Sequence, residues 1–123
     1  MTGTKDSPRR VLLIDDSADI LEAHALLLEV HGYEVRTARD GRSAMEVAPA
    51  FRPHAVLLDL GLPDQSGFDV FDRLRALPDL AETVFVAFSG RADPDDRTRS
   101  LEAGFHEHLV KPASLAAIKA ALG

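Results

Sequence analysis

The strongest constraint on the fold is an alternation between short apolar runs and longer segments whose apolar residues recur every three or four positions. Three runs are wholly apolar, at residues 11–14, 55–58 and 84–88. Such runs are typical of strands buried on both faces of a parallel sheet. Two more strands are expected at residues 33–38 and 106–110, where polar and charged side chains indicate edge positions.

Segments with helical spacing separate these strands. The first helix follows a candidate N-cap, Ser17, and its predicted inward face consists of Ile20, Ala23, Leu27 and Val30. Strands that alternate with helices of roughly 8–15 residues imply right-handed crossovers and a parallel sheet.

The other helices are predicted from weaker patterns. The second is expected to be broken by Pro49, and the third to place Phe68 and Phe71 in the core. The fourth, residues 93–103, is strongly polar, with Leu101 as its main apolar anchor. A short final helix is expected from residue 115 to the end of the chain.

The fold class that satisfies these patterns is a flavodoxin-like doubly wound α/β domain. It has five βα units and a five-stranded parallel sheet in the order 2-1-3-4-5, with the apolar strands in the middle. Residues 1–8 carry no periodic signal and are expected to form a flexible N-terminal tail, and residues 9–123 to form the single domain.

Composition excludes several classes of protein. The 20 acidic residues outnumber 14 Lys and Arg, and the net charge of −6 argues against nucleic-acid binding. The chain has no cysteine, so it has neither disulfides nor thiolate zinc ligands. No apolar run approaches the roughly 20 residues that span a bilayer, and no signal peptide is recognisable, so no membrane association and a cytoplasmic location are expected.

Polar residues gather where the strands end. Asp15 and Asp16 follow the first strand, Asp59 the third, Ser89 the fourth and Lys111 the fifth. Ligands of doubly wound sheets bind at this carboxyl edge, so we expect these side chains to converge. Clustered carboxylates favour a hard divalent cation with oxygen ligands, and Mg²⁺ fits best, with Mn²⁺ as a substitute.

This set of side chains predicts phosphoryl transfer. An aspartate can act as a nucleophile and carry the phosphoryl group as an acyl phosphate, and Asp59 is the predicted acceptor. Lys111 supplies a compact positive charge for a phosphoryl oxygen, and Ser89 can donate a hydrogen bond to another.

The arrangement resembles the receiver domain of two-component response regulators over residues 9–123. Each motif is short, but all occur in order at the strand ends. The matching segments are Ile14-Asp15-Asp16, Leu58-Asp59-Leu60-Gly61-Leu62-Pro63-Asp64 with Gly67, Ala87-Phe88-Ser89-Gly90 and Leu109-Val110-Lys111-Pro112.

The resemblance implies a role for each matching residue. Asp59 would be the phosphoacceptor, and Asp16, Asp59 and the Gly61 carbonyl would coordinate Mg²⁺, with Asp15 holding metal-bound water. Lys111 would pair with a phosphoryl oxygen, and the peptide bond to Pro112 would be cis.

Two residues would serve as the switch. Ser89 would bond the phosphoryl group and move on activation, as the resemblance implies. His108 departs from the family, which often has Tyr or Phe three residues before the lysine; a histidine can also swing inward or outward, and it titrates near neutral pH. The other histidines, His24, His31, His54 and His106, are expected to be surface or packing residues.

The resemblance also implies partners. A sensor histidine kinase or histidine phosphotransfer protein would supply a phosphohistidine, and a downstream protein would bind a surface formed by residues 93–103, 106–110 and 115–122. The domain would be a monomer or a phosphorylation-dependent dimer, and a switch rather than an enzyme, although it assists its own phosphorylation and slow dephosphorylation. A stand-alone single-domain regulator or phosphorelay shuttle is expected, with a domain of a hybrid histidine kinase or larger regulator as the alternative.

Three other functions fit these residues less well. A phosphotransferase of the haloacid dehalogenase type needs a second acid where this chain has Gly61. A flavin-binding flavodoxin-like protein is disfavoured because Asp15 and Asp16 would repel its phosphate. A receiver that acts without phosphorylation would not need the intact set of acids.

Overall fold

The computed structural model describes residues 9–62, 64, 66–90, 94–111 and 113–122, and places them in alternating strands and helices. The predicted tail, residues 1–8, lies outside the described residues. The elements in chain order are β1 Arg10–Ile14, α1 Ala18–Val30, β2 Glu34–Ala38, α2 Gly41–Phe51, β3 Ala55–Asp59, α3 Gly67–Arg75, the 3₁₀ helix η2 Pro78–Leu80, β4 Val84–Ser89, α4 Pro94–Ala103, β5 Glu107–Val110 and α5 Leu115–Leu122.

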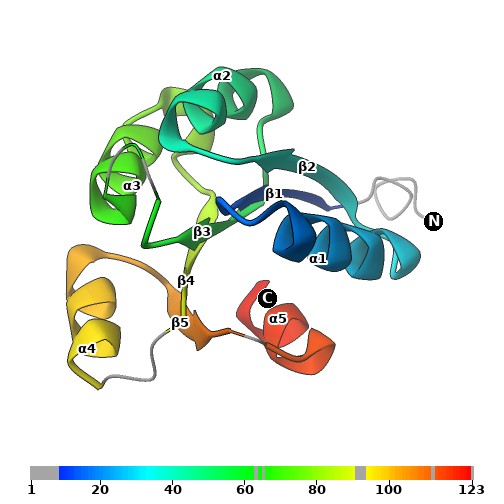
Figure 1. Cartoon of the computed structure of the whole chain (residues 1–123). Helices are drawn as coiled ribbons and strands as arrows, with labels where there is room; N and C mark the ends of the chain where they lie inside the picture. The colour runs from blue at the N-terminus through cyan, green and yellow to red at the C-terminus, as the bar shows by residue number, and fades with distance from the viewer. Residues whose placement is uncertain (1–8, 63, 65, 91–93, 112, 123) are drawn as a thin grey trace.

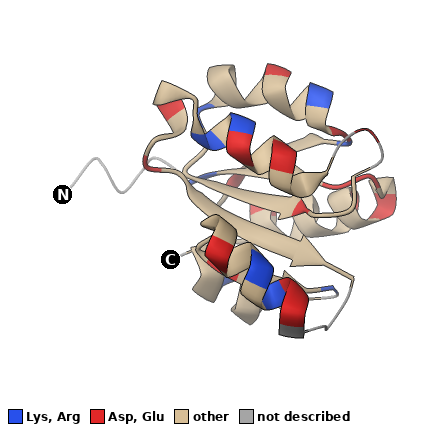
Figure 2. Ribbon diagram, turned by 90° about the vertical axis from the view of Figure 1, so that its left-hand side faces the viewer, with Lys and Arg blue, Asp and Glu red and all other residues tan. Residues whose placement is uncertain are grey.

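The sheet has the predicted topology. Its strands are parallel, in the order β2-β1-β3-β4-β5, and the two strands with polar residues lie at the edges. The helices cover both faces, with α1 and α5 on one side and α2, α3 and α4 on the other (Figure 1). Most Lys, Arg, Asp and Glu residues lie on helices and connecting segments, while the ribbon of the central strands is almost free of them (Figure 2).

A hydrophobic core lies on each face of the sheet. One contains Leu12, Leu58 and Phe71, and the other contains Leu13, Leu57 and Ile118. Neighbouring residues of a strand, such as Leu12 and Leu13, therefore enter different cores, as expected for strands buried on both faces. None of the described helices is long and apolar enough to cross a membrane.

The boundaries of the first helix follow from local chemistry. The Ser17 hydroxyl oxygen accepts a hydrogen bond of 3.3 Å from the backbone N–H of Ile20, which caps α1. Gly32, with φ of +93°, lies just past the helix end, in a backbone region that favours glycine.

The predicted inward face of α1 is wrong. Leu21 and Leu28 are the buried residues of this helix, whereas Ala23 is exposed and Val30 is 77% exposed. Apolar residues occur nearly all round this helix, so their spacing fits more than one face, and only packing against the sheet selects one.

Three further expectations also need correction. Pro49 lies inside α2 instead of breaking it, and we attribute this to packing of Ala44 and Ala48, both fully buried, which offsets the lost backbone hydrogen bond. Phe71 is a core residue but Phe68 is half-buried. Leu101 does not anchor α4, because 39% of its surface remains exposed.

Candidate functional site

The sheet register brings the acidic residues together. Ile14 of β1 pairs with Leu58 of β3, so the residues that follow them, Asp15 and Asp59, leave the sheet side by side. Asp15 and Asp59 are buried, with 3% and 6% of their surfaces exposed, and Asp16 is exposed. One carboxylate oxygen from each of these three residues lies within 4.8 Å of the others.

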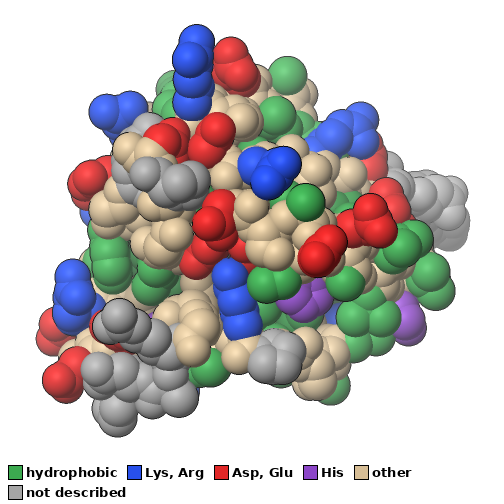
Figure 3. Space-filling model, in the orientation of Figure 1, with side chains coloured by type: hydrophobic (Ala, Val, Ile, Leu, Met, Phe, Trp, Pro, Cys, Tyr) green, Lys and Arg blue, Asp and Glu red, His purple; other side chains and the backbone are tan. Residues whose placement is uncertain are grey.

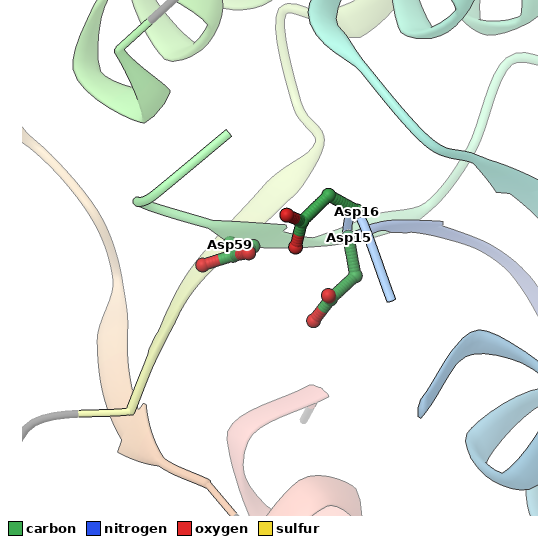
Figure 4. A group of neighbouring side chains, drawn as sticks. All are labelled: Asp15, Asp16 and Asp59. Carbon is green, nitrogen blue, oxygen red and sulfur yellow. The ribbon is translucent and has the colours of Figure 1, made fainter. Parts of the chain in front are cut away.

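The three acidic side chains share one end of the sheet. In Figure 4 the side chains of Asp15 and Asp16 diverge from the end of β1, and the Asp16 carboxylate points toward Asp59. Acidic side chains form a group near the middle of the molecular face in Figure 3, with a basic side chain directly beside them. The sequence prediction that these residues converge is therefore correct in geometry.

Lys111 binds two of the three acids. Its Nζ lies 2.5 Å from Oδ2 of Asp15 and 3.4 Å from Oδ2 of Asp59. The lysine follows β5, and its backbone N–H donates to the Ser89 carbonyl at 2.7 Å, which ties the ends of β4 and β5 together. Its Nζ also lies 5.6 Å from the centre of the Phe88 ring. Pro112, and with it the predicted cis peptide bond, lies outside the described residues.

Burial raises the pKa of the Asp59 carboxyl above its ordinary value, and the negative charge of Asp15 adds to this effect. A hydrogen bond of 3.0 Å from the Gly61 backbone N–H to Asp59 Oδ1 and the Lys111 cation oppose the increase. The environment thus balances the desolvation of a buried carboxylate against two groups that favour its charged form.

The acids have the donor chemistry that a hard cation requires. Asp15 Oδ2 is buried and, apart from its ion pair with Lys111, has no hydrogen-bond partner among the described residues. An oxygen with unused lone pairs beside two other carboxylates is a suitable ligand for a divalent cation. The residues of this site therefore fit such an ion.

A pocket of about 470 Å³ opens beside Asp59. Gly61 and Ser89 line it on the sheet side, and Asp96 and Arg99 of α4 line it on the other. Ser89 is buried at the end of β4, one position past the pair that Phe88 makes with Asp59. The predicted acceptor, hydroxyl and glycine thus share one pocket, whose far wall is α4.

A close approach of the backbone explains Gly67. A Cβ at this position would lie 2.5 Å from Leu60 Cα and 2.8 Å from the Asp59 carbonyl oxygen. Only glycine lets the segment that follows Asp59 return to the start of α3, where the Gly67 N–H donates to the Leu60 carbonyl at 3.1 Å.

Sequence reasoning missed the role of Asp64. Its carboxylate accepts hydrogen bonds from the backbone N–H groups of Gly41 and Arg42, at 3.0 and 3.2 Å, and so caps α2 from a distant loop. Asp64 belongs to the Leu-Pro-Asp motif, but nothing in the motif indicates that its partner is α2.

His108 lies away from the acids and faces α4. It is 5% exposed, and its Nδ1 lies 2.9 Å from the hydroxyl of Ser100. The remaining histidines make local contacts: Nδ1 of His54 accepts from the Arg10 N–H at 2.8 Å, and the His24 ring packs on Phe88. Nδ1 of His106 accepts a hydrogen bond of 3.0 Å from the backbone N–H of Phe85 in β4.

Comparison with known proteins gives a consistent result. Residues 11–123 match the family model described as the response regulator receiver domain. The transcriptional regulatory protein KdpE of Mycobacterium tuberculosis is 44% identical over 102 residues, which cover 83% of this chain and 44% of that protein. The chain thus spans about half the length of the curated relatives that it matches.

Solved structures agree on the fold. The chemotaxis response regulator CheY4 of Vibrio cholerae is 27% identical, with a TM-score of 0.86 over 94% of this chain and 99% of that one. A response regulator of Burkholderia pseudomallei, solved with a phosphorylated aspartic acid, calcium ion and citrate, is 28% identical, with a TM-score of 0.85 over 94% and 66% of the two chains.

Proposed function

The chain belongs to the response regulator receiver domain family, and from that premise we propose that it is a phosphorylation-dependent switch whose phosphoacceptor is Asp59. The observation that carries the proposal is the convergence of Asp15, Asp16, Asp59 and Lys111 at one end of the sheet. A sensor histidine kinase or a histidine phosphotransfer protein would supply the phosphoryl group from a phosphohistidine.

Phosphoryl transfer here would form one bond and break another. A carboxylate oxygen of Asp59 attacks phosphorus, the P–N bond of the phosphohistidine breaks, and its electron pair leaves with the imidazole of the donor. The product is an acyl phosphate on Asp59. Lys111, 3.4 Å from Asp59 Oδ2, would neutralise charge on the phosphoryl oxygens, and Ser89 would donate a hydrogen bond to one of them.

Asp15, Asp16, Asp59 and the Gly61 backbone carbonyl are the residues that we assign to Mg²⁺. When bound, the ion neutralises negative charge on the carboxylates and on the transferring phosphoryl group. Mn²⁺ prefers the same oxygen ligands and should replace it. The buried Asp15 Oδ2, which has no hydrogen-bond partner among the described residues apart from its ion pair with Lys111, supports this assignment.

The output surface that we propose consists of α4, β5 and α5. The pocket beside Asp59 supports this choice, because α4 forms its far wall through Asp96 and Arg99. A dianionic phosphoryl group on Asp59 would shift the balance between two arrangements of this surface, with Ser89 and His108 as the switch residues. A downstream protein would then distinguish the phosphorylated domain, as a monomer or a dimer.

The named relatives are transcriptional regulators, and this chain matches about half of their length. We therefore leave DNA binding out of the function proposed for residues 9–123. The single-domain role stays a prediction, and immunoblotting of source cells tests it: a band near 13.3 kDa supports it, and a band about twice that size, as in the named relatives, contradicts it.

The direct test of phosphoacceptor function is incubation of the chain with Mg²⁺ and acetyl phosphate, followed by intact-mass measurement. The expected product carries one phosphoryl group, and it does not form in Asp59→Asn or in the presence of excess EDTA. A chain that forms no adduct, or an Asp59→Asn variant that forms it equally well, would contradict the proposal.

A further inference from the structure

Helix α4 is attached to the sheet by an unusual contact. Among its described side chains, those of residues 95–103, Ser100 is the buried one, with 0% of its surface exposed. Leu101 is 39% exposed, and Ala103 is only partly buried. The contact of Ser100 is polar: its Oγ lies 2.9 Å from Nδ1 of His108 on β5.

The hydrogen bonds assign the proton on the His108 ring. A serine hydroxyl has one hydrogen, and that of Ser100 is donated to the Arg97 carbonyl at 2.9 Å. Ser100 Oγ must then accept the second bond, so Nδ1 of His108 carries the ring proton. The other ring nitrogen, Nε2, is left with a bare lone pair, and it is buried without a hydrogen-bond partner among the described residues.

Protonation of His108 would therefore place a positive charge in a buried site, at a ring nitrogen that has no hydrogen-bond partner among the described residues. The backbone carbonyl of Asp96 favours the protonated ring, but it offsets the cost of burial only in part. Burial accordingly lowers the pKa of His108, and its effect on this pKa is larger than that of any neighbouring charge.

Charged groups around the ring change this balance only in part. Asp96 raises the pKa through its charge and its backbone carbonyl, and Glu107 raises it slightly, while Arg97 lowers it. On the neighbouring strand, the residue opposite His108 is the uncharged Ala87. Arg97 and Glu107 are also paired with each other, at 3.6 Å, on the exposed side of the α4–β5 contact.

We propose that Ser100 and His108 form a pH-sensitive latch, in which neutral His108 holds α4 against β5 and protonation of Nε2 releases the helix. The latch goes beyond phosphoacceptor function and does not depend on it, because it operates in the unphosphorylated chain. Release would also move Asp96 and Arg99, which line the pocket beside Asp59.

The direction of the pH effect follows from linkage. A buried histidine that is neutral in the closed arrangement stabilises that arrangement. The stabilisation is complete at pH values above the ordinary pKa of an exposed histidine, about 6.5. This stabilisation is lost as the pH falls from that value toward the lowered pKa of the buried ring. Mild acid should therefore loosen α4. The other helices, which do not have this contact, should stay packed on the sheet.

The test is hydrogen exchange of backbone amides by NMR on the full chain, without phosphodonor or divalent cation, at pH 7.5 and 5.5. After correction for the intrinsic pH dependence of exchange, protection of α4 should fall by up to about tenfold at pH 5.5, where an exposed histidine is about ten times more often protonated than neutral. Protection of α2 should change much less. His108→Phe should remove this pH dependence, and His31→Gln, which changes the exposed histidine just past the end of α1, should keep it.

A second measurement does not depend on any variant folding. The ¹⁵N shifts of the His108 ring in the wild-type chain should show the Nδ1–H tautomer at pH 7.5 and a pKa below 6.5. An Nε2–H tautomer, an ordinary or raised pKa, or α4 protection that does not change with pH would overturn the latch. Because no phosphoryl transfer is involved, these results are independent of the acetyl phosphate experiment.

Discussion

Substitution of the proposed phosphoacceptor should stabilise the chain when no metal ion is present. Asp59→Asn keeps the shape of the side chain and the oxygen that accepts from the Gly61 N–H, but it removes one of three clustered negative charges. Active sites commonly store unfavourable interactions of this kind, and their removal raises the free energy of unfolding.

The magnitude follows from opposing terms. At an effective dielectric constant of 20, attraction to Lys111 at 3.4 Å contributes about 5 kcal/mol, and repulsion from Asp15 within 4.8 Å opposes it with at least about 3.5 kcal/mol. Asp16 adds a smaller, solvent-screened repulsion, so the Coulomb terms nearly cancel. Burial then decides the sign. Burial raises the pKa of Asp59, so the site disfavours its charged form, and we expect Asp59→Asn to gain the roughly 0.5–2 kcal/mol that is common for a stabilising substitution.

Urea unfolding at pH 7.5 measures the difference, first with EDTA and then with Mg²⁺. At ten times its Kd, Mg²⁺ should stabilise the wild-type chain by about 1.4 kcal/mol and Asp59→Asn by much less, so the advantage of the variant should shrink or vanish. Glu46→Gln removes a negative charge from an exposed position on α2 and should change stability by less than about 0.5 kcal/mol. If Asp59→Asn is less stable than the wild type in EDTA, attraction to Lys111 dominates and the reasoning fails.

Three further substitutions test the fold and the site. Phe71→Ala should lower the free energy of unfolding by about 3–5 kcal/mol in urea titrations, because this ring is 1% exposed and stacks on a second aromatic ring at 4.0 Å; a loss below about 1.5 kcal/mol would contradict that packing. Gly67→Ala should slow acyl phosphate formation and weaken Mg²⁺ binding, because its Cβ would lie 2.5 Å from Leu60 Cα. Gly90→Ala is the control for stability, because its Cβ would meet nothing within 4 Å. Equal rates of acyl phosphate formation and equal Mg²⁺ affinities in the two variants would refute the argument. Ser17→Ala should cost about 1 kcal/mol through loss of the cap of α1, and an unchanged unfolding midpoint would show that the cap contributes nothing.

Much of the site could be predicted because a parallel sheet converts chain order into position. Once residues 11–14 and 55–58 are recognised as neighbouring central strands, Asp15 and Asp59 must emerge at the same edge. The same logic places Ser89 and Lys111. Spacing alone, however, does not show that Lys111 reaches both Asp15 and Asp59, or that burial raises the pKa of Asp59.

The failures of prediction share one cause, which is that local patterns do not identify the partner surface. Leu101 is the large apolar residue of α4 and yet remains partly exposed, while Ser100 beside it is fully buried. The reason lies on β5, where His108 presents a polar group that only a polar neighbour can satisfy. Asp64 is a similar case, since its partners on α2 are more than 20 residues away along the chain.

The amino-acid sequence by itself therefore determined the order of the strands, the edge at which the acids gather and the family resemblance. These depend on periodicity and on residue types at strand ends, which are local properties of the chain. Only the tertiary structure decided which face of α1 is buried, how charge is balanced around Asp59, and that a buried serine of α4 lies against a histidine of β5. Each of these depends on distances between side chains remote in sequence, because hydrogen bonds and desolvation act over a few ångströms of space, whatever the separation along the chain.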